Sequence, residues 1–150
     1  MAATASGLYV LNWIDALDAT QLALDLSLST HKVAMFTNTI TPNFSTDTAY
    51  GVAPYNANEV AGTGYTAGGV VVASPTLTES PAGTMMYDIA DTQWLTSTIT
   101  NARFALIYAD VLAGNNGIVG ITLGADYSTV AGTFLITWAA AGVFTFDLVP

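Results

Sequence analysis

The sequence predicts an all-β protein, a single antiparallel β-sandwich of about seven to eight strands with one short N-terminal helix. Apolar and polar residues alternate with a period of two over much of the chain after residue 31, as in half-buried antiparallel strands. Turn-forming segments separate these runs at the spacing of a sandwich, and no second helix offers a parallel crossover. The 150 residues suit one domain, predicted over residues 1–150.

The N-terminal part of the chain, residues 1–28, is expected to form a helical arm segment. Apolar residues recur at three- and four-residue spacing over residues 8–19, which predicts a helix there. Ser6 and Gly7 are expected to precede it, and Thr20 to end it. A helix this short depends on tertiary packing for its stability.

Strands are predicted from Lys32 onward. The run Val33-Ala34-Met35-Phe36 is apolar throughout, which predicts a strand that is buried on both faces. Clear alternation with aromatic and β-branched residues predicts four further strands, and weaker patterns predict three more. The clear strands are 104–108, 119–123, 133–138 and 144–148, and the weaker ones are 69–74, 84–89 and 93–99.

Turn residues connect these predicted strands. Residues 80–83, 114–117 and 139–142 each lie between alternating runs and are predicted hairpin connections. Residues 39–66 contain two prolines and three glycines but few periodic residues. A loop of this length inside a compact domain is usually functional or interfacial, so we expect contacts with other subunits there.

The charge of the chain limits its partners. Eleven carboxylates face only Lys32 and Arg103, and the net charge is −9. Nucleic-acid binding requires clustered Lys and Arg, and an anionic membrane surface would repel this chain, so neither partner is expected. Only 9% of the residues are charged. A surface of neutral hydroxyls and amides is desolvated at lower cost than ions, which favours a protein that is packed against other proteins.

Metal and membrane sites are not expected either. The chain has no cysteine and one histidine, His31, which argues against thiolate and multi-histidine metal sites. Its apolar runs fall short of the ~18 residues of a membrane span, and residues 1–28 lack the cationic start of a secretion signal. We expect no cofactor and no export through a secretory pathway.

Two motifs suggest catalysis or ligand binding at first sight. The glycine-rich run 62–69 resembles a phosphate cradle, but it precedes a strand and lacks the following Lys-Ser/Thr. It is interpreted as a loop with positive φ and close backbone approach. Asp25, Ser29 and His31 are the residue types of a hydrolase triad, yet no nucleophile elbow surrounds Ser29. They are interpreted as a polar strand edge.

Carboxylates and tryptophans supply the remaining candidates. Glu59 and Glu79 are the two glutamates, but neither they nor the aspartates have the spacing of a glycosidase or calcium site. Solvated turn carboxylates are the simpler interpretation of Asp88, Asp91, Asp110 and Asp126. Trp13, Trp94 and Trp138 could stack on sugars. Trp138 is expected in the core with Phe134, whereas Trp94 is expected to be exposed.

Several segments in order resemble a group of small virion proteins of tailed bacteriophages. The resemblance covers roughly residues 30–148. Its central block is Asn58-Glu59-Val60-Ala61-Gly62-Thr63-Gly64-Tyr65-Thr66-Ala67-Gly68-Gly69. The flanking segments are 30–38, 91–94, 102–108, 132–138 and 142–144.

The resemblance implies a non-enzymatic structural protein of the virion, without catalytic residues to transfer. The leading expectation is a capsid decoration (cement) protein on the exterior of the phage head, assembled in the host cytoplasm. Its partners would be the major capsid protein lattice and further copies of itself, with a trimer favoured. A tail or fibre component that binds a host receptor or carbohydrate is the alternative. The expected interface residues are Asn43, Tyr50, Tyr55, Glu59, Tyr65 and Trp94.

Overall fold

A computed structural model describes residues 3–17, 22–80 and 83–148. These residues form eight strands and one helix, arranged in two antiparallel sheets. The predicted fold class is therefore confirmed: the protein is all-β with a single short helix, consistent with a β-sandwich. The elements in chain order are β1 (Gly7–Leu8), α1 (Val10–Leu17), β2 (Lys32–Thr37), β3 (Val70–Val71), β4 (Thr76–Ser80), β5 (Thr84–Asp88), β6 (Thr92–Ala109), β7 (Asn116–Ile136) and β8 (Phe144–Asp147).

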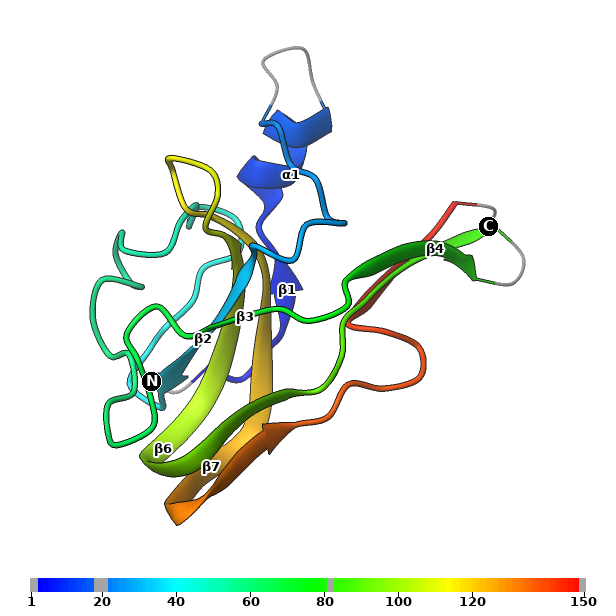
Figure 1. Cartoon of the computed structure of the whole chain (residues 1–150). Coiled ribbons are helices and arrows are strands. Elements are labelled where there is room, and N and C mark those ends of the chain that lie inside the picture. The colour runs from blue at the N-terminus through cyan, green and yellow to red at the C-terminus, as the bar shows by residue number, and fades with distance from the viewer. Residues whose placement is uncertain (1–2, 18–21, 81–82, 149–150) are drawn as a thin grey trace.

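The larger sheet has the strand order β1-β7-β6-β2-β3, and its centre is one long hairpin of β6 and β7. The predicted hairpin connection at 114–117 is confirmed. The separate strands predicted at 93–99 and 104–108 are parts of β6. The strand predicted at 119–123 is part of β7, and the one predicted at 133–138 forms the end of β7 as far as Ile136. Register shifts between Trp94 and Phe104 bend the hairpin without ending its pairing. The bend is visible at the lower end of Figure 1.

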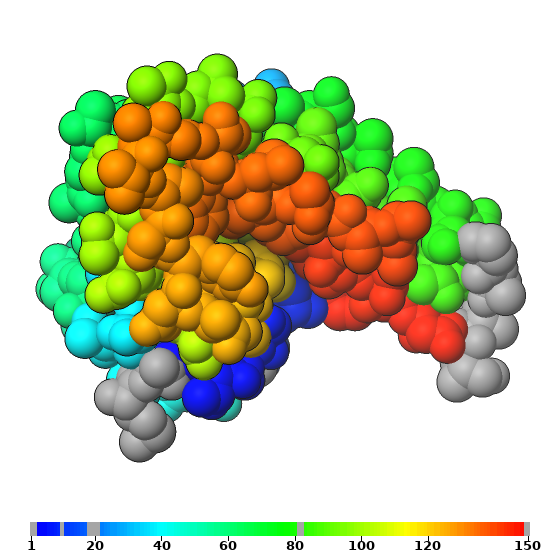
Figure 2. Space-filling model, turned by 90° about the horizontal axis from the view of Figure 1, so that it is seen from below, coloured from blue at the N-terminus to red at the C-terminus, as the bar shows by residue number. Residues whose placement is uncertain are grey.

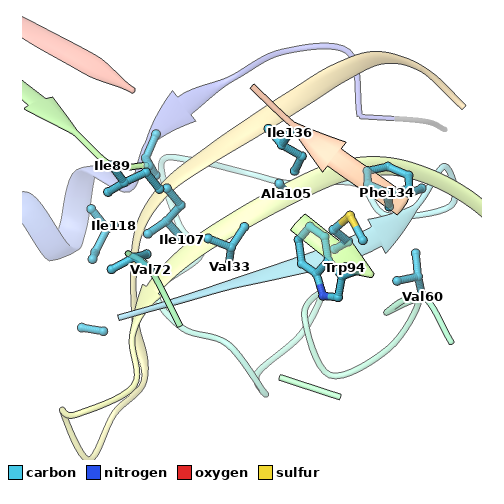
Figure 3. Close-up of a cluster of buried hydrophobic side chains, with 14 of the residues drawn as sticks. Val33, Val60, Val72, Ile89, Trp94, Ala105, Ile107, Ile118, Phe134 and Ile136 are labelled. Carbon is cyan, nitrogen blue, oxygen red and sulfur yellow. The ribbon is translucent and has the colours of Figure 1, made fainter. Parts of the chain in front are cut away.

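The bend lets the outer half of the hairpin pack over one face of its own sheet. Trp94, Phe134 and Ile136 come from this outer half. They belong to one buried cluster with side chains of β2 and of inner β6, such as Val33 and Ile107 (Figure 3). One continuous hairpin thus supplies both sides of this part of the core.

The long β2–β3 connection covers the opposite face of the sheet. Ile40 and Tyr55 from this connection join Phe36, Phe104 and other side chains of β2 and β6 in a second buried cluster. Residues 33–36 are fully buried, with alternate side chains in the two clusters, as predicted for a strand buried on both faces. The loop predicted over residues 39–66 therefore acts as a structural layer of the domain.

The smaller sheet, β4-β5-β8, is called the arm below, and it extends away from the body of the molecule (Figures 1 and 2). Its β4–β5 hairpin matches the predicted connection at 80–83, of which residues 81–82 lie outside the described part. The hairpin predicted at 139–142 is wrong, because β8 pairs with β5 and not with β7. The N–H of Val143 donates to the carbonyl of Tyr87 at 2.8 Å and brings the chain alongside β5.

The N-terminal helix begins later than predicted. It spans Val10–Leu17, and the predicted end at Thr20 lies outside the described residues. Gly7 and Leu8 instead pair with Gly120 and Val119 as strand β1. Within the described part of the chain, no helix is long and apolar enough to cross a membrane.

Candidate functional site

Three of the predicted interface residues meet in one polar cluster between the long loop and the sheet. The carboxylate of Glu59 accepts hydrogen bonds from the hydroxyls of Tyr50, at 2.8 Å, and Tyr65, at 2.7 Å. It also accepts one from the backbone N–H of Gly68, at 2.7 Å. Glu59 itself forms a β-bridge with Phe36 of β2. The Glu59 carboxylate therefore joins three separate positions of the β2–β3 connection at a point where this connection runs beside β2.

The electrostatics of this cluster keep its phenols protonated. Burial, followed by the hydrogen bond to Glu59, raises the pKa of Tyr50 to about 12. Burial also raises the pKa of Tyr65 and Tyr108 above the usual tyrosine range. Tyr108 donates to the carbonyl of Gly68 at 2.9 Å, and its ring stacks on Tyr50 with centroids 4.5 Å apart. The cluster ties the loop to the sheet through satisfied hydrogen bonds.

Two of the predicted interface residues are not at the surface. Tyr55 and Trp94 are each only 2% exposed. Tyr55 packs against Phe36 and Tyr9, while Trp94 packs against Phe134. The expected exposure of Trp94 is wrong, because the bend in the β6–β7 hairpin turns this strand end onto the core. A sugar-stacking surface cannot use this ring in the folded protein.

The sixth predicted interface residue, Asn43, is exposed. Its side-chain oxygen accepts a hydrogen bond from the N–H of Ser45, and its own N–H donates to Asp47. These bonds close a local turn in the long loop. Of the predicted set, Asn43 lies on the surface, whereas Tyr50, Glu59 and Tyr65 are half-buried in the polar cluster.

Asp25, Ser29 and His31 are not arranged as a hydrolase triad. The Asp25 carboxylate accepts hydrogen bonds from the hydroxyl and N–H of Ser27, which lower the pKa of Asp25. His31 is fully buried, and its Nε2 lies 2.7 Å from the backbone oxygen of Asp25. Ser29 lies in an exposed turn and not on an extended strand edge. This group closes the turn that leads into β2.

The remaining carboxylates are dispersed. Asp110 pairs with Lys32 at 2.9 Å, and Asp126 pairs with Arg103 at 3.5 Å. Asp91 accepts a hydrogen bond from the N–H of Trp138. Across the described residues, no three acidic or histidine side chains gather where they could hold a metal ion.

The glycine-rich run 62–69 has the structural role that its sequence predicts. Gly62 has a φ of 144°, and a Cβ there would lie 1.8 Å from the carbonyl oxygen of Thr98. Gly69 has a φ of 78°, and a Cβ there would meet the carbonyl oxygen of Val33 at 1.8 Å. These glycines let the loop approach the sheet backbone, so they are close-packing positions.

An uncovered apolar surface lies on the arm. Pairing places Leu77, Tyr87 and Phe144 in one row, and Glu79, Met85 and Phe146 in the next row on the same face. The opposite face is polar apart from Met86, since the other rows hold threonines, Ser80, Asp88 and Asp147. Sequence reasoning missed this amphipathic sheet because it identified neither β4 nor the β5–β8 pairing.

Helix α1 covers only the inner part of that face. The ring of Trp13 lies 5.7 Å from Phe144 and 5.1 Å from Phe146, centroid to centroid. Phe146 lines a shallow groove with Ile14 and Leu17 of α1, and its strand neighbour Met85 lines a second groove with Leu77 and Leu148. The uncovered surface formed by Ile14, Leu17, Leu77, Met85, Phe146 and Leu148 is called the apolar arm face below.

Comparison of the chain with protein-family models, curated protein sequences and solved structures found no match.

Proposed function

We propose that this protein is a structural assembly protein without enzymatic activity, and specifically a capsid decoration protein of a tailed bacteriophage. The observation that carries the proposal is the apolar arm face, which extends from a well-packed body and is covered by the described chain only at its inner end, where Trp13 packs on Phe146. Exposed apolar patches on otherwise packed proteins commonly mark protein–protein contacts. The resemblance to tailed-phage virion proteins suggests that the assembly is a phage virion.

The division of the surface supports a two-contact role. The apolar arm face would bind the major capsid protein lattice on the head exterior. The exposed part of the long loop, around Asn43, would contact neighbouring copies, with a trimer as the favoured arrangement. Because few surface residues are ionic, both contacts would form at a low cost of desolvation.

Binding to empty shells tests this function directly. Purified protein is added to expanded capsid shells that lack it, and bound protein is measured after sedimentation together with shell stability. We expect hundreds of copies per shell and greater resistance to heat. Absence of binding, together with unchanged shell stability, would remove the capsid role.

The alternative is a tail or fibre component that binds a host receptor or carbohydrate. The burial of Trp94 takes away the aromatic residue on which the carbohydrate interpretation mainly rested. Tyr65, the second candidate, has its hydroxyl engaged with Glu59 and with the N–H of Met35. The number of copies per virion separates the two functions, since a handful of copies would indicate the tail.

A further inference from the structure

We infer that the apolar arm face docks on a partner protein whose matching surface is apolar at its centre and lined with Lys and Arg at its rim. This inference rests on the proposed assembly function and specifies the chemistry of the partner surface. It follows from three features of the arm: continuous apolar exposure, a single sign of charge and the absence of neighbouring bases.

The first feature is exposure of large apolar side chains along one continuous surface. Leu77 is 44% exposed and Leu148 is 68% exposed, both on the outer part of the arm. Ile14 and Leu17 of α1 are 55% and 81% exposed at the inner end. Met85 and Phe146 are register partners and connect the two ends. The apolar arm face therefore extends from the helix to the tip of the sheet.

The second feature is the charge around this face. Glu79 lies on the apolar side of the sheet, in the same row as Met85 and Phe146, and is exposed. Asp88 and Asp147 belong to the other side of the same three strands. The arm strands carry these three carboxylates and no Lys or Arg. A binding partner therefore meets an apolar centre with negatively charged carboxylates around it.

The third feature is the position of the two basic side chains. Lys32 pairs with Asp110, and Arg103 pairs with Asp126, so both engage carboxylates of the larger sheet and its turn. Neither belongs to the arm or to α1. Neutralisation of Glu79 must then come from the partner, and Lys or Arg at the partner's rim supplies it.

The same charges argue against a second copy on this face. Two arms placed face to face would bring Glu79 of each chain into a low-dielectric contact without a base. Each chain also carries a net charge of −9, which adds long-range repulsion. Like charges across an interface disfavour the wrong partner. The occupant is accordingly a different, basic-rimmed protein surface, and on the proposed function it is the major capsid protein.

The test uses the full chain and expanded shells of the major capsid protein of the phage that encodes it. Leu77→Ser combined with Met85→Ser removes apolar contacts, and Glu79→Lys reverses the rim charge. We expect each to weaken binding to the shells at least tenfold, with Glu79→Gln intermediate. Binding of the unchanged chain should weaken as salt is raised, and this salt dependence should be smaller for Glu79→Gln.

Val130→Ser is the matched control, because Val130 is 86% exposed on β7, outside the arm. It should bind like the unchanged chain.

The outcomes separate the inference from the proposed function. Shell binding that the arm variants leave unchanged would overturn the docking inference and retain the capsid function. No shell binding by the unchanged chain would overturn both. Sedimentation velocity of the free protein is the third measurement of the test. Self-association that Leu77→Ser with Met85→Ser abolishes would place a second copy on the face and overturn the inference. Circular dichroism of each variant establishes that the variants tested are folded.

Discussion

The body and the arm use the same kind of strand in opposite ways. In the body, the larger sheet is covered on both faces, by the bent end of its own β6–β7 hairpin on one side and by the long β2–β3 connection on the other. In the arm, one face is polar and the other is covered only at its inner end, where Trp13 meets Phe144 and Phe146. Apolar side chains in the body stabilise the fold, whereas those of the outer arm remain available to a partner.

This difference predicts that stability and assembly can be changed separately. Substitutions in the body should lower the free energy of unfolding. Substitutions on the outer arm should leave that free energy nearly unchanged and act on binding. Alkaline pH and four substitutions, in order of decreasing effect on stability, test that separation.

The largest effect is expected from alkaline pH, because the body contains most of the buried phenols. Burial raises the pKa of Tyr9, Tyr55, Tyr65 and Tyr108, and the pKa of Tyr50 rises to about 12. The unfolded chain therefore loses these protons first. The stabilisation is fully present below pH about 10 and is lost as pH rises through the folded-state values.

Denaturant unfolding followed at a series of pH values measures this loss. The free energy of unfolding should be steady up to about pH 9 and should fall steeply above about pH 10. A Tyr50→Phe variant should show a shallower fall. Equal stability at about pH 9 and about pH 11 would mean that the phenols are not protected in the folded body.

The next effect is expected at the centre of the body. Phe104 is fully buried and contacts the rings of Phe36, Phe44 and Tyr55. Phe104→Ala should lower the free energy of unfolding by about 3–5 kcal/mol, since it removes buried area and leaves a cavity. Chemical denaturation measures the change, and the exposed Val130→Ala provides the control. A loss below about 1 kcal/mol would contradict tight packing between the loop and the sheet.

Trp13 connects the two regions, so its removal should have an intermediate effect. Its Nε1 donates to the carbonyl of Ile118 at 3.1 Å, and its ring packs on Phe144 and Phe146. Trp13→Ala should cost about 2–3 kcal/mol and should speed amide hydrogen exchange in β8 more than in β6. Trp13→Phe keeps a ring and should cost about 1 kcal/mol. Equal acceleration of amide hydrogen exchange in β6 and β8 would show that the arm does not unfold as a separate unit.

A smaller effect is expected at the polar cluster. Glu59→Gln places an amide N–H₂ among three donors from Tyr50, Tyr65 and Gly68, so at least one donor loses its acceptor. We expect a loss of about 1–2 kcal/mol and faster hydrogen exchange across the following loop. Glu79→Gln on the exposed arm is the matched control, with an unchanged free energy of unfolding. An unchanged free energy of unfolding for both Glu59→Gln and Glu79→Gln would mean that the polar cluster around Glu59 does not hold the loop.

The smallest effect on stability is expected at the outer arm. Leu77→Ser changes a side chain that is already 44% exposed, so the free energy of unfolding should change by about 0.5 kcal/mol or less. Thermal and chemical denaturation measure this change. A loss comparable with that of Phe104→Ala would contradict the difference between body and arm, because the arm face would then be part of the core.

Local patterns were sufficient for much of the fold. The apolar run 33–36 predicted a strand buried on both faces, and the glycine-rich run 62–69 predicted close backbone approach; both are confirmed. The site was harder to predict. The sequence predicts Glu59, Tyr50 and Tyr65 of the long loop as interface residues, but their common hydrogen-bond cluster depends on where that loop crosses the sheet. The predicted exposure of Trp94 is wrong because the bulges that bend β6 break the alternation of this segment.

The amino-acid residues alone predict the all-strand class, the single short helix, the 114–117 hairpin and the scarcity of charge. These depend on period, turn chemistry and composition, which act over a few neighbouring residues. The folded structure was needed to show that four predicted strands form two bent ones, and that β8 pairs with β5 across more than fifty residues of chain. Strand pairing is a choice among distant partners, settled by which apolar faces can be buried together. On the outer arm, no described segment of the chain covers the apolar face.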